Sequence, residues 1–384
     1  MISAESFITA ATARGIGLWT GVPCSYLTPF INGVISSSAL RYIGAANEGD
    51  AVAIAAGAEL GGVPSVAMFQ NSGLGNAVNP LTSLTWTFRL PVLVIVTWRG
   101  EPGGAADEPQ HELMGRVTPQ FLDTMDIPWA PFPAEEAAIA PALDRAFAHF
   151  RAEQRPFALV MSKGTVAETA LTTTPPPPLV PVPPSALRTV PRASRRDMLF
   201  ALQSALRPDD VVIATTGYMG RELAALEDRA CQLYMVGSMG CASSFGLGLA
   251  LAQPRRRVIV IDGDGAALMR LGALATVGTE RPANLVHLLL DNGLHESTGG
   301  QATVSRNVDF AAVAAACGYP RVEALSRPEA LARALADATP GLRFIHVPIV
   351  PGVPARLPRP TVTPADVAAR LRQHLGTWAA GAGR

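Results

Sequence analysis

Lysine is almost absent from this 384-residue sequence, which has a single lysine, Lys163, among its 31 basic residues. Any Schiff-base chemistry would have to use Lys163, but the segment LVMSKGTV looks like the end of a strand entering a loop, which favours a structural role. Charged residues are also scarce, at 16%, and the formal net charge is zero. Because no basic stripe is present, we expect no nucleic-acid partner.

Cysteine pairs with metal-binding spacing are missing as well. The four cysteines, Cys24, Cys231, Cys241 and Cys317, include no C-x-x-C pair, which argues against structural zinc and favours reduced thiols in a cytoplasmic protein. The longest apolar runs, such as LPVLVIVTW, are far shorter than the roughly 18 residues of a membrane span. The first residues contain an acid and no early basic cluster, unlike a secretory signal. We therefore expect neither a membrane partner nor secretion.

Proline is concentrated in one stretch, TTTPPPPLVPVPPSALRTVPR, which has neither helical nor strand periodicity. So many fixed proline dihedrals predict an extended, semi-rigid linker. The chain is long enough for two domains of ordinary size. We predict a first domain over residues 1–171, a linker over 172–192 and a second domain over 193–384.

Both predicted domains alternate short apolar strands with helical segments. In the first, SVAMF, PVLVIVTW and FALVMS are the strands; in the second, DVVIATTG, RRVIVIDGDG, NLVHLLLDN and RFIHVPI repeat the pattern. This alternation is typical of α/β domains with a mostly parallel sheet flanked by helices. Ligands of such sheets bind beyond the carboxyl ends of the strands.

Asp264 and Asn292 each follow such a strand. A segment expected to be one helix, ALMRLGALATVG, and the strand NLVHLLL separate them, so one right-handed crossover would bring them to the same sheet edge. A carboxylate and an amide oxygen suit a hard cation that holds a phosphate group. Singly, Asp264 could instead cap a helix and Asn292 could form a turn.

The spacing of these residues resembles the metal and diphosphate motif of thiamine diphosphate enzymes: Gly263-Asp264-Gly265, twenty-six residues, then Asn292. The resemblance implies thiamine diphosphate and Mg²⁺ as cofactors and two domains of the thiamine diphosphate-binding type. It assigns the cation to Asp264, Asn292 and the backbone carbonyl of Leu294, and further cofactor contacts to Gly263, Gly265 and Ala266. The usual Asn-Asn pair is Asp291-Asn292 here.

Two further segments resemble the same family. In YIGAANEGDAVAIAAGAE, Glu48 corresponds to the glutamate that activates the cofactor's aminopyrimidine, although Glu48 or Asp50 could also simply favour the helix dipole. In MVGSMGCASSFGLGLALA, Met239 corresponds to the apolar wedge under the cofactor and Gly237 to a carbonyl for its aminopyrimidine. Thr216 and Gly217, after another strand, correspond to diphosphate contacts.

Only the proline stretch stands between the two domains, so the chain resembles the compact members of the family that lack a middle domain. The segments NEGDAVAIAAGAELGG, QNSGLGNAVNPLTSL and DNGLHESTGGQ resemble decarboxylases of phosphonopyruvate and, next, of sulfopyruvate. The resemblance implies conversion of 3-phosphonopyruvate to phosphonoacetaldehyde and CO₂ in phosphonate biosynthesis, including antibiotic biosynthesis. A sulfopyruvate decarboxylase, another 2-oxo acid decarboxylase or carboligase, and a non-catalytic cofactor sensor are the alternatives.

Three residues are candidates for binding the substrate or transferring a proton to it. Arg99, after a predicted strand, offers paired donors to a phosphonate, and a solvated surface arginine is the alternative. His111 and His295, in loops, could relay a proton to the reacting carbon or bind the phosphonate, and the sequence does not choose between these roles. Since Glu48 and Asp264 belong to different domains, the family architecture implies a homo-oligomer, at least a dimer, with active sites between subunits.

Overall fold

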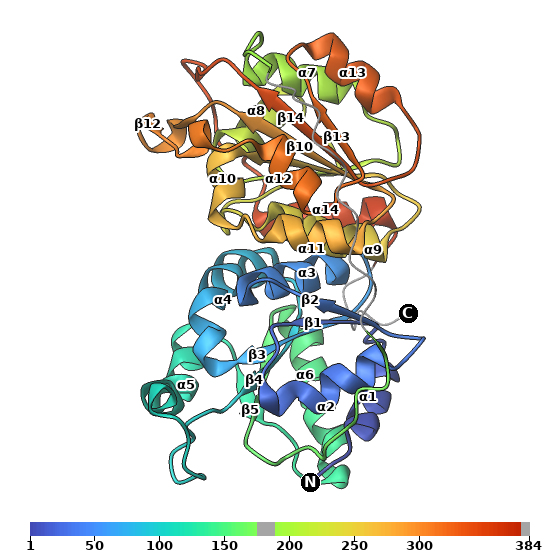
Figure 1. The fold of residues 1–384 in the computed structure, drawn as a ribbon, viewed down its shortest axis with the longest axis vertical. Helices are drawn as coiled ribbons and strands as arrows, with labels where there is room; N and C mark the ends of the chain where they lie inside the picture. The colour runs from blue at the N-terminus through green and yellow to red at the C-terminus, as the bar shows by residue number, and fades with distance from the viewer. Residues whose placement is uncertain (175–188, 378–384) are drawn as a thin grey trace. The chain divides into compact units, whose positions relative to one another are not determined.

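The computed structural model describes residues 1–174 and 189–377, which form two compact units (Figure 1). Unit 1 comprises Met1–Pro177 together with Thr377–Arg384, and unit 2 comprises Pro178–Gly376. Most of the predicted linker, residues 175–188, lies outside the described residues. Within those residues, no helix combines the length and apolarity that crossing a bilayer requires.

Unit 1 is built on six parallel strands in the order β2-β1-β3-β4-β6-β5. The strands are β1 (Leu18–Gly21), β2 (Arg41–Gly44), β3 (Ser65–Gln70), β4 (Leu93–Thr97), β5 (Trp129–Pro131) and β6 (Phe157–Met161). The helices are α1 (Ala4–Thr12), α2 (Thr28–Ile35), α3 (Glu48–Leu60), α4 (Leu74–Pro80), α5 (Glu112–Thr124) and α6 (Glu136–Glu153). Every residue of β4 and β6 is buried, which explains their unbroken apolar sequences.

Unit 2 repeats this design, with the strand order β13-β14-β10-β9-β7-β8, again all parallel. The strands are β7 (Val211–Ala214), β8 (Gln232–Tyr234), β9 (Val258–Gly263), β10 (Leu285–Asp291), β13 (Arg321–Ala324) and β14 (Arg343–Pro348). A short antiparallel pair, β11 (Leu294–His295) with β12 (Gln301–Ala302), follows β10. The predicted α/β class with two parallel sheets is confirmed.

The helices of unit 2 contain one departure from the prediction. They are α7 (Arg195–Ala205), α8 (Tyr218–Leu226), α9 (Ala242–Ala252), α10 (Asp264–Met269), α11 (Ala273–Glu280), α12 (Phe310–Ala316), α13 (Pro328–Ala336) and α14 (Pro364–Leu375). The segment ALMRLGALATVG was expected to be one helix, and this was wrong. Arg270 leaves the helical region at φ −137° and ψ 52°, so the chain forms α10 and then α11, which begins after Gly272.

Helix α3 carries the candidate residue Glu48 in its first turn. Asn47 caps the helix by accepting the N–H of Gly49 over 2.9 Å, and every residue from Gly49 to Leu60 is buried. The small residues allow this close packing, whereas Glu48 in the first turn stays partly exposed. The helix therefore offers Glu48 at the end that follows β2.

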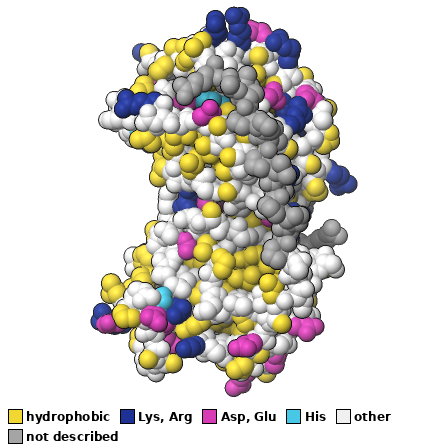
Figure 2. All heavy atoms as spheres, viewed as in Figure 1, with side chains coloured by type: hydrophobic (Ala, Val, Ile, Leu, Met, Phe, Trp, Pro, Cys, Tyr) yellow, Lys and Arg dark blue, Asp and Glu magenta, His cyan; other side chains and the backbone are white. Residues whose placement is uncertain are grey.

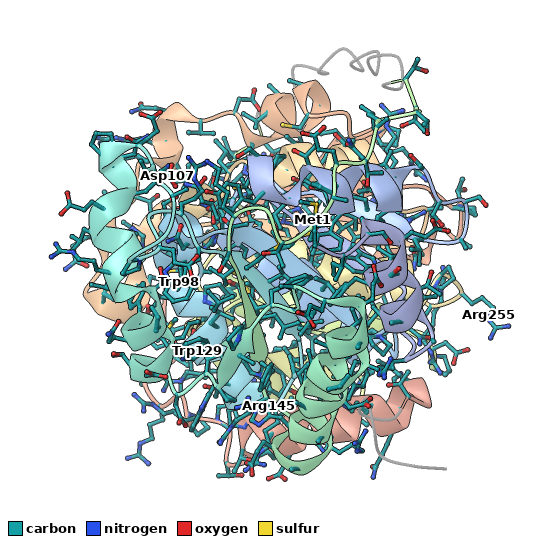
Figure 3. All side chains as sticks on the ribbon, turned by 90° about the horizontal axis from the view of Figure 1, so that it is seen from below. Met1, Trp98, Asp107, Trp129, Arg145 and Arg255 are labelled. Atoms are coloured by element: carbon teal, nitrogen blue, oxygen red, sulfur yellow. The ribbon has the colours of Figure 1, made fainter. Side chains whose placement is uncertain are left out.

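An aromatic pair fixes the loops that follow β4. The rings of Trp98 and Trp129 meet edge to face, with centroids 6.4 Å apart (Figure 3). The indole N–H of Trp98 donates to the carbonyl of Gly115 over 2.7 Å. Because Trp98 directly precedes Arg99, this packing also anchors the start of the Arg99 segment.

The surface and the cysteines agree with the composition. On the face drawn in Figure 2, acidic and basic side chains are interspersed rather than gathered into a patch of one sign. All four cysteines are free thiols, and Cys24, Cys231 and Cys241 are buried. Lys163 is exposed in the turn after β6, as its sequence context predicted.

Candidate active site

Strands β9 and β10 bring Asp264 and Asn292 together. The two strands are parallel neighbours, with Leu290 paired to Gly263, so Asp264 and Asn292 follow them at the same edge of the sheet. The backbone N–H of Asn292 lies near enough to the Asp264 carboxylate to lower the pKa of that group, against the larger opposing effect of burial. The crossover predicted from the sequence therefore produces the expected contact.

A cavity of about 80 Å³ lies at this edge of unit 2. Most of the residues predicted to contact the cofactor in this half of the chain line it, namely Thr216, Gly217, Met239, Gly263, Asp264, Gly265, Ala266, Asn292 and Leu294. The substrate candidate His295 lines it as well. Gly237 lies two residues before Met239 and is outside this lining. Sequence positions more than 70 residues apart thus converge on one cavity, as the cofactor motif requires.

The walls of the cavity suit an anionic group. Gly217 precedes α8 with φ +94°, a conformation that a side chain would strain, and no side chain caps this helix. The first N–H groups of α8 therefore remain available to a phosphate. The hydroxyl of Thr215 is buried at the cavity without a hydrogen-bond partner, and a methyl group at Gly263 would meet no atom within 4 Å. These features fit a diphosphate.

Asp264 is buried, and its burial raises the pKa of its carboxyl group. A hydrogen bond donated by Thr303, with its Oγ1 2.5 Å from Oδ2, lowers this pKa, whereas the nearby Asp291 carboxylate raises it further. A bound cation would favour the carboxylate form. A divalent cation bound here would therefore offset the cost of burying the negative charge of the Asp264 carboxylate.

The remaining candidate ligands are neutral oxygens. Asn292 Oδ1 accepts the N–H of Leu294 over 3.0 Å, and an amide oxygen has a second lone pair for a cation. Within residues 1–174 and 189–377, no three His, Cys, Asp or Glu side chains are grouped to hold a metal. A cation at Asp264 would therefore depend on Asn292, the Leu294 carbonyl and the oxygens of a ligand, as Mg²⁺ sites on phosphates do.

Met239 and His295 approach the cavity around Gly265. A methyl group at Gly265 would lie 2.6 Å from Cε1 of His295 and 3.4 Å from Cε of Met239. Met239 is presented by a tight loop, in which Ser238 has φ +50° and Gly240 has φ +91°. A non-glycine residue in this region stores backbone strain, which is typical of ligand sites. A side chain at position 265 would therefore require the His295 ring to move.

A buried arginine at the cavity was not predicted from the sequence. Arg195 donates through Nη1 to Glu296 over 2.7 Å and through Nε to Glu222, and it is only 5% exposed. Glu296 also accepts the N–H of Gly352 over 2.6 Å. Arg195 and Glu296 line the cavity and tie the loop after His295 to α7 and α8. Because Arg195 and Glu296 are distant in the sequence, no local sequence pattern predicts their contact.

In unit 1, Glu48 faces the segment that follows β3. Its Oε2 accepts a hydrogen bond from Asn76 over 2.8 Å, and a methyl group at Gly73 would lie 2.2 Å from its Oε1. Glycine at position 73 is what makes room for the carboxylate. Glu48 is thus held at the carboxyl edge of the sheet by α4 and the turn before it.

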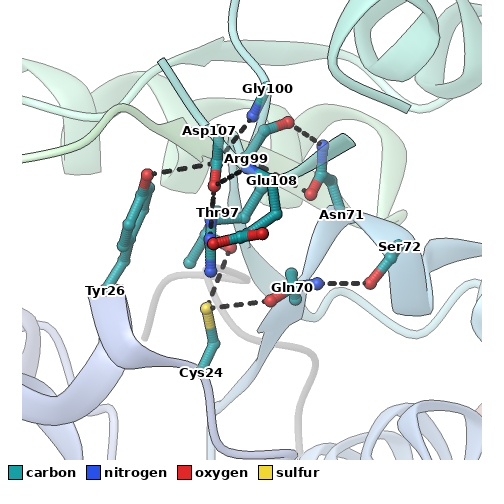
Figure 4. A network of polar contacts seen from close by, with 10 residues as sticks. All are labelled: Cys24, Tyr26, Gln70, Asn71, Ser72, Thr97, Arg99, Gly100, Asp107 and Glu108. Carbon is teal, nitrogen blue, oxygen red and sulfur yellow. Dashed lines mark hydrogen bonds and ion pairs between the residues drawn. The ribbon is translucent and has the colours of Figure 1, made fainter. Parts of the chain in front are cut away.

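Arg99 is held by a neighbouring carboxylate (Figure 4). Asp107 accepts from Arg99 Nε over 2.6 Å and from Nη2, and from the N–H of Gly100 over 3.0 Å. These hydrogen bonds hold the pKa of Asp107 well below its usual range. Arg99 also lies over the ring of Tyr26, with Cζ 5.0 Å from the centroid. Arg99 is therefore an oriented side chain rather than a solvated surface arginine.

Two further contacts tie Arg99 to the strand ends of unit 1. Asn71 donates through Nδ2 to the carbonyl of Arg99 over 2.9 Å and to the hydroxyl of Thr118 over 3.0 Å. Asn71 lies two residues before Gly73, which packs on Glu48. One short segment therefore fixes the positions of both Arg99 and Glu48.

His111 is buried at the start of α5, and its Nδ1 has no hydrogen-bond partner. The structure thus puts His111 in unit 1 and His295 at the cavity of unit 2. Two further histidines lie on strands of unit 2: His287 is fully buried against Tyr319, and His346 contacts Asp291 through Nε2 at 3.1 Å. His149, on α6, is half-buried against Phe157.

Residues 1–127 match the thiamine pyrophosphate enzyme N-terminal TPP binding domain, and residues 214–347 match the C-terminal TPP binding domain of the same enzymes. The chain belongs to the thiamine pyrophosphate enzymes. It is 47% identical to phosphonopyruvate decarboxylase of Streptomyces viridochromogenes, over 99% of this chain and 97% of that protein. It is 31% identical to sulfopyruvate decarboxylase of Methanosarcina acetivorans, over 97% of each. The resemblance predicted from the motifs is confirmed.

The fold is also that of solved enzymes of this class. Benzoylformate decarboxylase from Polynucleobacter necessarius matches with a TM-score of 0.71 and 13% identity, over 94% of this chain and 100% of that chain. At this identity the likeness concerns the fold alone.

Proposed function

We propose that this protein catalyses the thiamine diphosphate-dependent decarboxylation of 3-phosphonopyruvate to phosphonoacetaldehyde and CO₂. The near full-length identity of 47% to a phosphonopyruvate decarboxylase carries the proposal. The cavity that Asp264, Asn292 and Gly217 line supports it, because its walls suit a diphosphate and a cation.

Each candidate residue has a role in this proposal. Asp264, Asn292 and the carbonyl of Leu294 would hold Mg²⁺, while Thr216 and Gly217 would contact the diphosphate that the cation binds. Met239 and the carbonyl of Gly237 would orient the rest of the cofactor. When bound, thiamine diphosphate would accept the electron pair that CO₂ leaves on the substrate.

Glu48 would serve the aminopyrimidine ring of the cofactor. Its carboxyl group, held by Asn76, would hydrogen-bond a ring nitrogen and so favour the tautomer that removes a proton. A purely structural cofactor site would not need this carboxyl group, so Glu48 favours catalysis over the sensor alternative.

Arg99 would bind the phosphonate through Nη1, because Nε and Nη2 already bind Asp107. His295, at the cavity, or His111 would supply a proton to the reacting carbon or a second contact to the phosphonate. We further propose a homo-oligomer of at least two chains that share their active sites, with domains at 1–171 and 193–384.

Incubating the protein with thiamine diphosphate, Mg²⁺ and one 2-oxo acid at a time tests the proposal. We expect CO₂ and an aldehyde in equal amounts from phosphonopyruvate, and a much lower kcat/KM for sulfopyruvate and pyruvate. Preference for sulfopyruvate would favour the activity named for the 31% identical relative. CO₂ release with less than one aldehyde per CO₂ would indicate carboligation.

A further inference from the structure

Thr303 contacts both chain segments that carry the candidate cation ligands. Its hydroxyl donates to Oδ2 of Asp264 over 2.5 Å, and its backbone N–H donates to the carbonyl of Gly293 over 2.9 Å. Gly293 lies between Asn292 and Leu294. One residue therefore links the end of β9 to the turn after β10.

The hydroxyl of Thr303 is also in contact with Ser305. Its Oγ1 accepts the backbone N–H of Ser305 over 3.3 Å, and the Ser305 hydroxyl, 2.8 Å away, can donate its one proton either to Oγ1 or, over 3.2 Å, to Oδ1 of Asp291. His346, on β14, contacts the other oxygen of Asp291 at 3.1 Å. Thr303 and Ser305 are 5% and 2% exposed, so water does not compete for these hydrogen bonds. The series fixes the hydroxyl that meets Asp264.

A carboxylate that binds a hard cation gains from being oriented before the cation arrives. The terminal torsion of aspartate is broad, so an untethered Asp264 carboxylate would rotate between many orientations. A hydrogen bond to one oxygen removes that freedom. Loss of such outer contacts typically weakens metal affinity about 10- to 100-fold.

We propose that Thr303 is a positioning residue for the divalent cation: its hydroxyl orients the Asp264 ligand while its N–H fixes the turn that carries Asn292 and Leu294. This inference rests on the proposed function, because it takes Asp264 as the cation ligand. It adds a residue that lies 39 positions from Asp264 and outside the cofactor motif. Thr303 touches neither substrate nor cofactor in this role.

The test compares Thr303→Val with Thr303→Ser in the full chain. Valine keeps the shape and the N–H but removes the hydroxyl, whereas serine keeps both donors. Binding of thiamine diphosphate is measured by equilibrium dialysis at a series of Mg²⁺ concentrations. We expect the Mg²⁺ concentration for half-maximal binding to rise about 10- to 100-fold in Thr303→Val and to change less than about 3-fold in Thr303→Ser. Saturating Mg²⁺ should largely restore kcat in Thr303→Val.

Two controls separate this role from general stability and from the proposed function. Thr85→Val removes an equally buried hydroxyl, bonded to the Leu81 carbonyl in unit 1, and should leave the Mg²⁺ dependence unchanged. Asp264→Asn should weaken Mg²⁺-dependent binding at least as much as Thr303→Val. If Asp264→Asn has no effect, the proposed cation site is wrong; if it weakens binding but Thr303→Val does not, only the Thr303 inference is overturned.

If Thr303→Val does not fold, a second variant tests the role of Thr303. Ser305→Ala removes the support behind the Thr303 hydroxyl and should raise the half-maximal Mg²⁺ concentration about 3- to 10-fold. An unchanged Mg²⁺ dependence in Ser305→Ala, with Thr303→Val unfolded, would also overturn the inference.

Discussion

Asp107 engages two of the three nitrogens of the Arg99 guanidinium, with Nε at 2.6 Å, and no hydrogen bond from Nη1 is found among the described residues. The carboxylate fixes the plane of the guanidinium, and Tyr26 lies beneath it. A second anion could therefore be met by Nη1 without a search for the right rotamer.

We expect Arg99→Lys to lower kcat/KM for phosphonopyruvate about 10-fold or more, because an ammonium group cannot bind Asp107 through two nitrogens and a phosphonate through a third. Pyruvate, which lacks the phosphonate, should be affected much less. The ratio of the two kcat/KM values is the measurement, and Arg116→Lys on the exposed face of α5 is the matched control. An unchanged ratio would move the phosphonate pocket elsewhere, with His111 and His295 tested next by the same ratio.

Asp107→Asn should destabilise the protein in a pH-dependent manner. The pKa of Asp107 is lowered chiefly by the Arg99 hydrogen bonds, so the stabilisation is complete above the pKa of an unfolded aspartate, about 4, and declines as the pH falls below it. Near neutral pH we expect a loss of about 1–3 kcal/mol in the free energy of unfolding. Urea unfolding between pH 7 and pH 3 checks this, and a wild-type advantage that grew on acidification would contradict it.

Glu48→Gln should reduce turnover about 100-fold or more while cofactor affinity changes little. The amide keeps the size of the side chain and the partner Asn76 but does not exchange a proton as a carboxyl group does. Single-turnover kinetics and calorimetry with thiamine diphosphate separate the two effects. Glu112→Gln, exposed in the same unit, is the control, and near-normal turnover of Glu48→Gln would remove it from the mechanism.

Asp264→Ala should lose Mg²⁺-dependent binding of thiamine diphosphate, recovered only weakly by excess cofactor, because the remaining candidate ligands are neutral. Calorimetry measures the affinity, and an unaltered value would refute the cation assignment.

Mixing the Asp264→Ala and Glu48→Gln variants tests whether two chains share an active site. If Glu48 of one chain serves Asp264 of another, mixed dimers regain one intact site, up to about a quarter of the normal activity. Mixtures that stay inactive would favour sites within one chain.

Arg195→Met should destabilise the protein by about 3–5 kcal/mol, because it leaves the buried carboxylates of Glu222 and Glu296 without their shared cation. Arg14→Met breaks the more exposed pair with Asp144 and should cost less than about 1 kcal/mol. Urea unfolding of both variants provides the comparison. Equal losses would mean that the two pairs contribute alike despite their different burial.

The parts of the site that the sequence predicted share one property: they follow parallel strands. The position of Asp264 after β9 and of Asn292 after β10 depends only on strand periodicity and the handedness of the crossover, and the structure agrees. Thr216 and His295 reach the same cavity for the same reason. The fold class was predictable from the same alternation of apolar strands and helices.

The residues that the sequence did not predict act through partners distant in the chain. Arg195 meets Glu296 across 101 positions, and Thr303 meets Asp264 across 39. Each is an ordinary residue locally: Arg195 begins a capped helix, and Thr303 lies in a polar loop. Asp107 lies only eight residues after Arg99, but its hydrogen bonds to Arg99 depend on how the loop between them folds back. Local patterns do not encode such pairings.

The solitary lysine gives the protein a convenient chemical handle. Lys163, the one lysine in the printed sequence, is exposed in the turn after β6. A fluorophore or an immobilisation tether could thus be attached to unit 1 at a defined point, without introducing a cysteine beside the four native thiols.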